Sequence, residues 1–266
     1  MHAVTSRYFR YFLASHQIGL LAYFLIDAWS WFGYGQMVLI RTPHFPTLLD
    51  LINNNVWLIN IFIMLTIALW SLFAFDLLNR KLQILLFIFS LSLHNANPYI
   101  IHEPQQIANL LLFIQIFFLP ADAKTFIDKK IILILTIALG VYYLTAGLKK
   151  MPDPLWQNGD ALGFIISWPP FSNFSTIVNE ITNHKFLMQF LNWFTLIFEI
   201  SFLPLLFTRW RDGLFFIGFL FHLGIFLAME VGTFSYIMLS WYALVFPIDK
   251  YILILRQLLQ KKKLLK

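Results

Sequence analysis

Eight long stretches of the chain are almost entirely apolar, and short polar segments separate most of them. They cover approximately residues 11–33, 55–78, 82–100, 105–120, 130–148, 186–208, 213–230 and 232–248. A helix that crosses a bilayer needs about 20 mostly apolar residues. The pattern therefore predicts an all-α protein, a polytopic bundle of about eight transmembrane helices.

Two parts of this pattern predict spans that are short or broken. Polar residues between His94 and Asn97, followed by Glu103 and Pro104, interrupt the third and fourth stretches. The last two stretches are divided only at residues 231–232. A tight hairpin or one kinked helix is expected there.

The composition is that of a membrane protein. Of the 266 residues, 59% are apolar and 12% are charged, against about 45–50% and about 25% in soluble domains. A soluble domain of this size would need more polar surface. We expect one membrane domain over residues 1–250, with loop 149–185 lying on the bilayer surface, and a basic cytoplasmic tail over residues 251–266.

Charge and cysteine content exclude several classes of function. The net charge is +6, but no basic face is interleaved with exposed aromatic residues, so no nucleic-acid partner is expected. The chain contains no cysteine, which excludes disulfides, thiolate metal sites and a cysteine nucleophile.

The distribution of basic residues predicts the orientation. With a cytoplasmic N-terminus and eight spans, most Lys and Arg residues, including those of the tail, fall on the cytoplasmic side. The opposite side receives only Arg41, Lys149, Lys150 and Lys185. Because cytoplasmic loops are enriched in Lys and Arg, we predict that both termini are cytoplasmic (N-in/C-in).

Six ionisable residues lie within the predicted spans or at their ends. They are His16, Asp27, His94, Glu199, His222 and Glu230. A charge placed in a bilayer costs about 2.5–3.5 kcal/mol, so each is a candidate functional group; pairing with a neighbouring helix is an equally open interpretation. Asp76 and Arg80 are four residues apart and are expected to form a helix-end ion pair.

Metal binding is not indicated. Glu180 with His184, and His94 with His102, have spacings that would place each pair on one helix face. Neither pair extends to the three or four ligands of a typical site, so no metal is expected. No phosphate-binding loop, dinucleotide-binding or Gly-x-Ser-x-Gly motif occurs.

Lys149 and Lys150 are adjacent at the end of the fifth apolar stretch. A lysine at a helix end usually extends to the lipid headgroups. Alternatively, one of the two turns inward and becomes a neutral amine, because both burial and the neighbouring ammonium disfavour its charge. Such an amine would serve as a general base. Glu230 is predicted on the same side of the membrane.

Two sequence blocks carry a family resemblance. Residues 143–159 read YLTAGLKKMPDPLWQNG, and residues 221–247 contain FH, GTFSYIML and FP in that order. They resemble the motifs of the vitamin K-dependent gamma-carboxylase superfamily, also called the HTTM membrane domain. With a weaker block from Phe113 to Ala123 and an acid at Asp27, the resemblance covers nearly the whole chain.

The resemblance implies a site and a cofactor. In the carboxylases, the second lysine of the pair is regarded as the base that deprotonates reduced vitamin K at the lumenal face; by motif position this is Lys150. The implied site comprises Lys150, Lys149, Glu230 and His102, with a reduced quinone as cofactor. A histidine that assists the animal enzyme aligns with Gln105, three residues after His102.

Three functions remain open. The first is carboxylase-like chemistry, with a lysine base at an outward-facing quinone- or lipid-binding pocket. The second function is that of a non-catalytic component for maturing or exporting a secreted peptide, whose carboxylates the lysines bind. It is suggested because the chain ends soon after the membrane domain, and short bacterial relatives resemble a membrane component that helps mature a secreted peptide toxin in sporulation-delaying systems. A transporter is the third. We expect a bacterial cytoplasmic membrane as the location.

Overall fold

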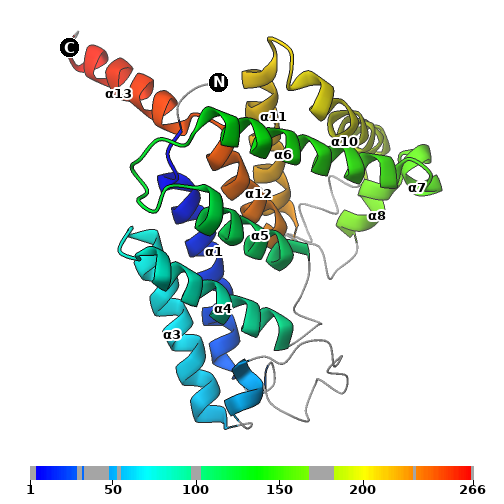
Figure 1. The fold of residues 1–266 in the computed structure, drawn as a ribbon. Helices are drawn as coiled ribbons and strands as arrows, with labels where there is room; N and C mark the ends of the chain where they lie inside the picture. Colours follow the sequence, from blue (N-terminus) through cyan, green and yellow to red (C-terminus); the bar gives the residue numbers. More distant parts are fainter. Residues whose placement is uncertain are drawn as a thin grey trace. The chain divides into compact units, whose positions relative to one another are not determined.

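A computed structural model describes residues 4–28, 32, 48–52, 55–96, 103–167, 183–229 and 232–264 (Figure 1). Its elements are α1 (Arg7–Ile26), the 3₁₀ helix η1 (Leu48–Ile52), α3 (Val56–Ala74), α4 (Arg80–Ala96), α5 (Glu103–Phe118), α6 (Lys129–Lys150), α7 (Pro154–Asn158), α8 (Ala161–Ser167), α10 (Lys185–Leu205), α11 (Arg211–Ala228), α12 (Gly232–Val245) and α13 (Ile248–Leu264). No β-strand occurs within these ranges. The predicted all-α class is confirmed.

Each of the eight apolar stretches overlaps one helix: α1, α3, α4, α5, α6, α10, α11 or α12. Local capping fixes where some of them begin. The Asn55 side chain accepts hydrogen bonds from the backbone N–H groups of Trp57 and Leu58 at 3.0 and 3.4 Å, and Asp128 accepts one from Lys130 at 2.6 Å. These side chains satisfy N–H groups that the first helical turn leaves unpaired.

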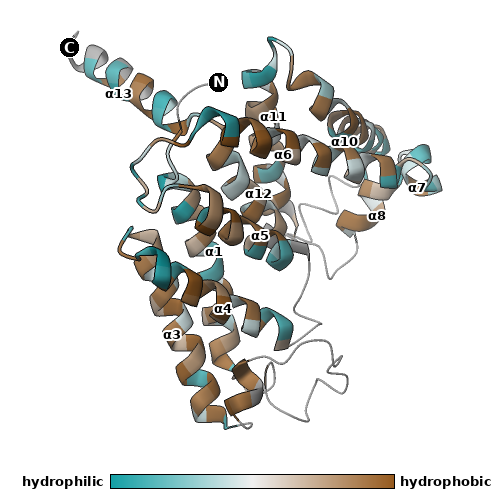
Figure 2. Ribbon diagram, in the orientation of Figure 1, coloured by the Kyte–Doolittle hydropathy of each residue, from teal (hydrophilic) through white to brown (hydrophobic). Residues whose placement is uncertain are grey.

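Several helices suit a lipid bilayer. Among the described residues, α3, α6 and α10 are long and apolar enough to cross a membrane. Residues 234–245 of α12 and 248–254 of α13 meet the same criterion only together, and they are bent by 79° at the break between them. Figure 2 shows how apolar residues dominate the long helices. The count of eight spans and the orientation remain predictions.

The described residues form two compact units, one within residues 5–127 and the other within residues 128–264 together with Val4. In the first unit, α1 packs along α3, α3 packs on α4, and α4 packs on α5. Its core contains fully buried Leu13, Ile63 and Leu86. A buried hydrogen bond from the Trp70 indole to the Ser90 hydroxyl, 3.1 Å long, joins α3 to α4.

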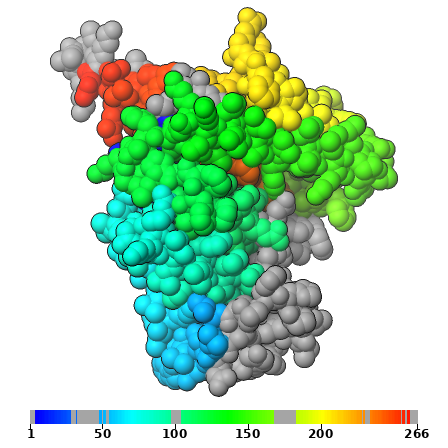
Figure 3. Space-filling view, viewed as in Figure 1, coloured from blue at the N-terminus to red at the C-terminus, as the bar shows by residue number. Residues whose placement is uncertain are grey.

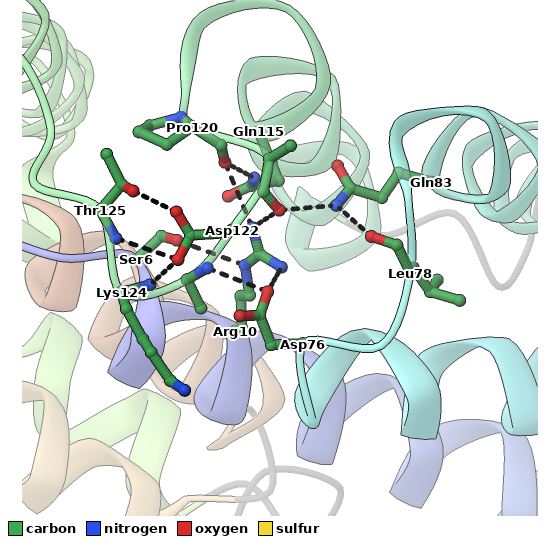
Figure 4. Close-up of polar contacts among 12 residues, drawn as sticks. Ser6, Arg10, Asp76, Leu78, Gln83, Gln115, Pro120, Asp122, Lys124 and Thr125 are labelled. Atoms are coloured by element: carbon green, nitrogen blue, oxygen red, sulfur yellow. Dashed lines mark hydrogen bonds and ion pairs between the residues drawn. The ribbon is translucent and has the colours of Figure 1, made fainter.

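A cluster of polar side chains joins α1 to the turn after α3 and to the loop after α5 (Figure 4). Arg10 is fully buried and contacts the Asp76 carboxylate at 2.7 Å. Its guanidinium also donates to the carbonyl oxygens of Pro120 and Ala121, at 3.3 and 2.7 Å. The charge of Arg10 is therefore compensated within the protein.

The prediction that Asp76 and Arg80 form an ion pair is wrong. Asp76 lies in the turn after α3, where its φ of 62° is left-handed, and Arg80 begins the next helix, so the two do not share a helix face. Asp76 binds Arg10 instead. Arg80 donates to the carbonyl oxygens of Gln115 and Leu119, at 2.6 and 2.7 Å.

The loop after α5 is stabilised by Asp122. Its carboxylate accepts hydrogen bonds from the Thr125 hydroxyl and from the backbone N–H groups of Lys124 and Thr125, the latter two at 2.7 and 3.1 Å. The hydroxyl of Thr125, followed by the N–H of Lys124, holds the pKa of Asp122 below its usual range, because hydrogen bonds to a carboxylate favour its charged form.

In the second unit, α6 packs along α10, and α12 packs on both α6 and α11. Two glycines of α6 permit a close approach to α10. A Cβ at Gly140 would lie 2.6 Å from Leu203 Cδ1, and one at Gly147 would lie 2.8 Å from Ile200 Cγ1. Small residues at such positions let transmembrane helices pack closely.

Candidate functional site

Lys150, the last residue of α6, meets Glu199 of α10. The lysine Nζ donates to both carboxylate oxygens of Glu199, to the second at 2.5 Å. The side chain of Glu199 is 8% exposed and that of Lys150 27%. The pair is thus largely removed from water, where an unpaired charge would be costly.

The ring of Trp156 completes the surroundings of Lys150. The ammonium lies 5.1 Å from the ring centroid, within the range of a cation–π interaction. Trp156 is buried, and its carbonyl accepts a hydrogen bond of 2.9 Å from the side-chain amide of Asn192 on α10. The short helix α7 therefore rests on α10 beside the ion pair.

The sequence around Trp156 explains why α7 is so short. Asp153 caps its start by accepting from the N–H of Leu155 at 2.8 Å, and Pro154 occupies the first turn, where its missing N–H costs nothing. Gly159 ends the helix at a φ of 79°, a left-handed conformation that glycine adopts without strain.

A second polar cluster is buried farther along α6. The Tyr143 hydroxyl is hydrogen-bonded to Nε2 of His222 on α11 and, at 2.8 Å, to the hydroxyl of Tyr242 on α12. All three side chains are at most 2% exposed. Aromatic rings surround the histidine, including Phe221 and Phe234 at 5.3 and 5.9 Å between centroids. We call these three residues the Tyr–His–Tyr cluster.

Hydrogen-bond counting favours one tautomer of His222. If Tyr242 donates to Tyr143 and Tyr143 donates to Nε2, every donor of the cluster is used except the N–H at Nδ1 of His222. In the opposite arrangement, the Tyr242 hydroxyl and Nδ1 would both lack a partner. His222 Nδ1 has no partner among the described residues. The N–H group at Nδ1 of His222 is therefore a buried donor that can form a hydrogen bond to an oxygen atom of a ligand.

The two clusters share one face of α6. Tyr143, Gly147 and Lys150 are spaced by four and three residues, so they line one side of the helix. Glu199 is close enough to Tyr143, and Lys150 to His222, for each pair to interact electrostatically. The ion pair and the Tyr–His–Tyr cluster thus lie along the same face of α6.

The predicted site residues are only partly within the described ranges. Lys150 turns toward α10, whereas Lys149 is exposed. Glu230 and His102 both lie outside the described residues. Gln105, which aligns with a histidine of the animal enzyme, is buried in α5.

The sequence did not indicate that Glu199, Tyr143 and Tyr242 belong to the site around Lys150. Glu199 was a candidate by position, but nothing in the sequence paired it with Lys150. Tyr143 and Tyr242 were not proposed as functional residues. Tyr143 stands in the block that carries the family resemblance, and that was the only signal for it.

The first unit holds two further buried histidines, His16 of α1 and His94 of α4. They are close enough to interact electrostatically. Across the described ranges, no group of three or more His, Asp or Glu side chains could hold a metal ion.

Comparison with known families identifies the class of protein. The model of the HTTM domain family matches residues 108–249, more than half of the chain, and the chain therefore belongs to that family. This match confirms the resemblance drawn from the two sequence blocks. No curated protein and no solved structure matches the chain.

Proposed function

We propose that this HTTM-domain protein is a multi-pass protein of the bacterial cytoplasmic membrane that binds a reduced, lipid-soluble quinone beside Lys150, whose amine accepts a proton from it. The observation that carries the proposal is the inward position of Lys150, held by Glu199 and Trp156. With eight spans and cytoplasmic termini, this end of α6 faces the outside.

The residues present fit such a ligand. Trp156 and the rings around His222 offer flat apolar surfaces for an aromatic head group. The unpartnered Nδ1 of His222 offers a donor to one of its oxygens, and Lys150 offers a base to another. When bound, a reduced quinone would supply an acidic O–H group and reducing equivalents.

Glu199 explains how the lysine could act as a base although it is ion-paired. Where water reaches the pair, the ammonium and carboxylate are the favoured forms. When water is excluded, the low dielectric penalises both charges, and transfer of the proton from Nζ of Lys150 to Glu199 leaves a neutral amine and a neutral acid. Lys150 then accepts a proton from the ligand and returns to the ammonium form, and Glu199 releases its proton to solvent when water again reaches the pair.

Oxygen uptake in nanodiscs tests the catalytic proposal. The purified protein is supplied with a reduced naphthoquinone near pH 7, and the enzyme-dependent rate is recorded. Loss of a general base typically costs 10²–10⁴-fold, so Lys150→Ala should lower the rate by roughly 10²-fold or more, whereas Lys149→Ala should stay near wild type. A wild-type rate in Lys150→Ala overturns the base assignment.

A peptide-maturation role is the second candidate, and the exposed position of Lys149 favours it. Lys150 is already bound to Glu199, whereas an exposed ammonium at Lys149 can meet the carboxylate of a peptide. Lipid extraction separates the two functions. Isoprenoid quinone recovered from wild-type protein and lost from Lys150→Ala supports the first; no quinone in wild type, with peptide binding that needs Lys149, supports the second.

The proposed orientation has its own test. A green fluorescent protein fused after Lys266 should fluoresce, since this reporter matures on the cytoplasmic side. Alkaline phosphatase inserted after Gln157 should be active, since it needs the oxidising outer side. Opposite results at both positions contradict the N-in/C-in topology.

A further inference from the structure

We propose that α13 lies along the membrane surface as an amphipathic helix whose apolar stripe enters the lipid boundary and whose basic residues bind anionic lipid headgroups. This inference does not depend on the chemistry at Lys150. It rests on the direction of α13, its sequence pattern and its exposed side chains.

The direction of α13 follows from the bend after α12. The axes of the two helical segments differ by 79°, so if α12 crosses the bilayer near the normal, α13 runs nearly parallel to the membrane plane. Figure 1 shows α13 leaving the end of α12 at a steep angle.

Contacts within the unit hold this bend. The Tyr251 hydroxyl donates to Asp212 Oδ2, in the first turn of α11, at 3.3 Å. Its ring stacks on Phe246, with 4.9 Å between centroids. The first turn of α13 is therefore fastened beside the start of α11.

The sequence of α13 is that of a surface helix. Six apolar residues recur at intervals of three and four and form a stripe along one side of the helix, at positions 248, 251, 252, 255, 258 and 259, whereas Leu253 and Ile254 lie outside it. Opposite this stripe are polar positions such as Gln257 and Gln260. With Asp249, Lys250, Arg256 and Lys261–Lys263 in one helix, α13 carries too many charges to cross the hydrocarbon core.

The apolar side chains of α13 are not covered by the described part of the protein. Leu259, on the stripe, is 55% exposed, and Leu253 and Ile254, outside the stripe, are 57% and 40% exposed. Figure 2 shows apolar and polar residues side by side on this helix, and Figure 3 shows it protruding at the edge of the view. Such a combination of apolar stripe and basic residues matches an anionic bilayer surface, which offers acyl chains and negative headgroups together.

The loop between α10 and α11, which lies next to the start of α13, also has the residues expected at a bilayer boundary. Phe207 and Trp210, between α10 and α11, are 65% and 62% exposed. Arg209 lies over the Trp210 ring at 5.3 Å. Exposed aromatic and basic residues gather at membrane–water interfaces, and Asp212, which fixes the start of α13, directly follows this loop.

The length of α12 suits a helix at the boundary. Its 14 residues span about 21 Å, less than the roughly 30 Å of a hydrocarbon core. A surface helix lies about 5–10 Å below the membrane surface. If α13 lies at that depth, the end of α12 to which it is joined lies there too, so a shorter α12 is sufficient.

The absence of cysteine from the chain allows a direct test with single-cysteine variants of the full protein. Leu259→Cys and Gln257→Cys lie on opposite sides of α13, two residues apart. Each is labelled with a polarity-sensitive fluorophore and placed in nanodiscs of either phosphatidylglycerol with phosphatidylcholine or phosphatidylcholine alone. In the anionic nanodiscs, we expect a blue-shifted emission at position 259 and an aqueous emission at position 257. The shift should decrease in phosphatidylcholine and with added salt.

A charge variant and a cross-linking control sharpen the result. Replacing Lys261, Lys262 and Lys263 by Gln should reduce the shift at position 259 in anionic nanodiscs while leaving the melting temperature unchanged. Aqueous emission at both positions, equal blue shifts at both, or an equal shift in neutral lipid each overturns the proposal. Disulfide-linked dimers of unlabelled Leu259→Cys, formed on mild oxidation, would show that a second copy covers the helix and would also overturn it.

Discussion

Gly147 of α6 faces Ile200 of α10 so closely that a Cβ at Gly147 would lie 3.2 Å from the Ile200 backbone nitrogen and 3.1 Å from Glu199 Cβ. The glycine sits three residues before Lys150, on the same helix face. The close approach of the two helices therefore brings the Glu199 carboxylate within reach of the lysine.

Gly147→Ala should force α6 and α10 apart. Because a backbone atom limits the space, we expect a loss of about 1–3 kcal/mol in the free energy of unfolding and a weaker bond between Lys150 and Glu199. Gly224→Ala is the matched control, since nothing lies within 4 Å of a Cβ there, and helix propensity predicts up to about 1 kcal/mol of stabilisation. Thermal unfolding in detergent compares them; equal melting temperatures would contradict the packing argument.

Because Lys150 and Glu199 form an ion pair, we predict that the effects of substituting them on the free energy of unfolding are not additive. Lys150→Met leaves the Glu199 carboxylate buried without a partner, and Glu199→Gln leaves the ammonium without its counter-charge. We expect each to destabilise the protein by about 1–3 kcal/mol, and the double variant to lose less than the sum. Unfolding of all four proteins gives the coupling energy; a value of zero would show that the two charges do not interact.

The geometry of the Tyr–His–Tyr cluster predicts that Tyr143→Phe destabilises the protein more than Tyr242→Phe. Tyr143→Phe removes both hydrogen bonds of the cluster and leaves His222 Nε2 without its partner, at a cost of about 1–3 kcal/mol. Tyr242→Phe removes one bond and should cost less. Melting temperatures of the two variants in the same lipid decide the order, and a larger loss for Tyr242→Phe would refute the central position of Tyr143.

Asp76 is both an ion-pair partner and a residue in the left-handed region, and two substitutions separate these properties. Asp76→Asn loses the charge that Arg10 requires but tolerates the conformation. Asp76→Ala loses both and should cost roughly 1 kcal/mol more. Thermal unfolding measures the difference, and identical stabilities of the two variants would show that the backbone at Asp76 is not strained.

Much of the fold could be predicted from the sequence, because a bilayer imposes a simple rule on helix length and polarity. Each of the eight apolar stretches overlaps a helix, but within the described residues only α3, α6 and α10 are long and apolar enough by themselves to meet this rule. The pairing of Asp76 with Arg80 failed because the rule of four-residue spacing holds only within one helix, and a turn separates these residues.

The candidate site could be predicted only in part. A motif drew attention to Lys150, but its partner Glu199 lies on another helix, and the register of α6 against α10 depends on glycines whose neighbours a single sequence does not reveal. The same limit applies to Tyr143, His222 and Tyr242, which come from three helices.

The cluster at Arg10 also sets an order of events during synthesis. The carbonyl groups that receive its guanidinium belong to Pro120 and Ala121, 110 and 111 residues later in the chain. A ribosome must therefore release α1, α3, α4 and α5 before Arg10 can be buried with all its acceptors. Until then the guanidinium lacks two of its acceptors, although Arg10 lies in the first helix of the chain.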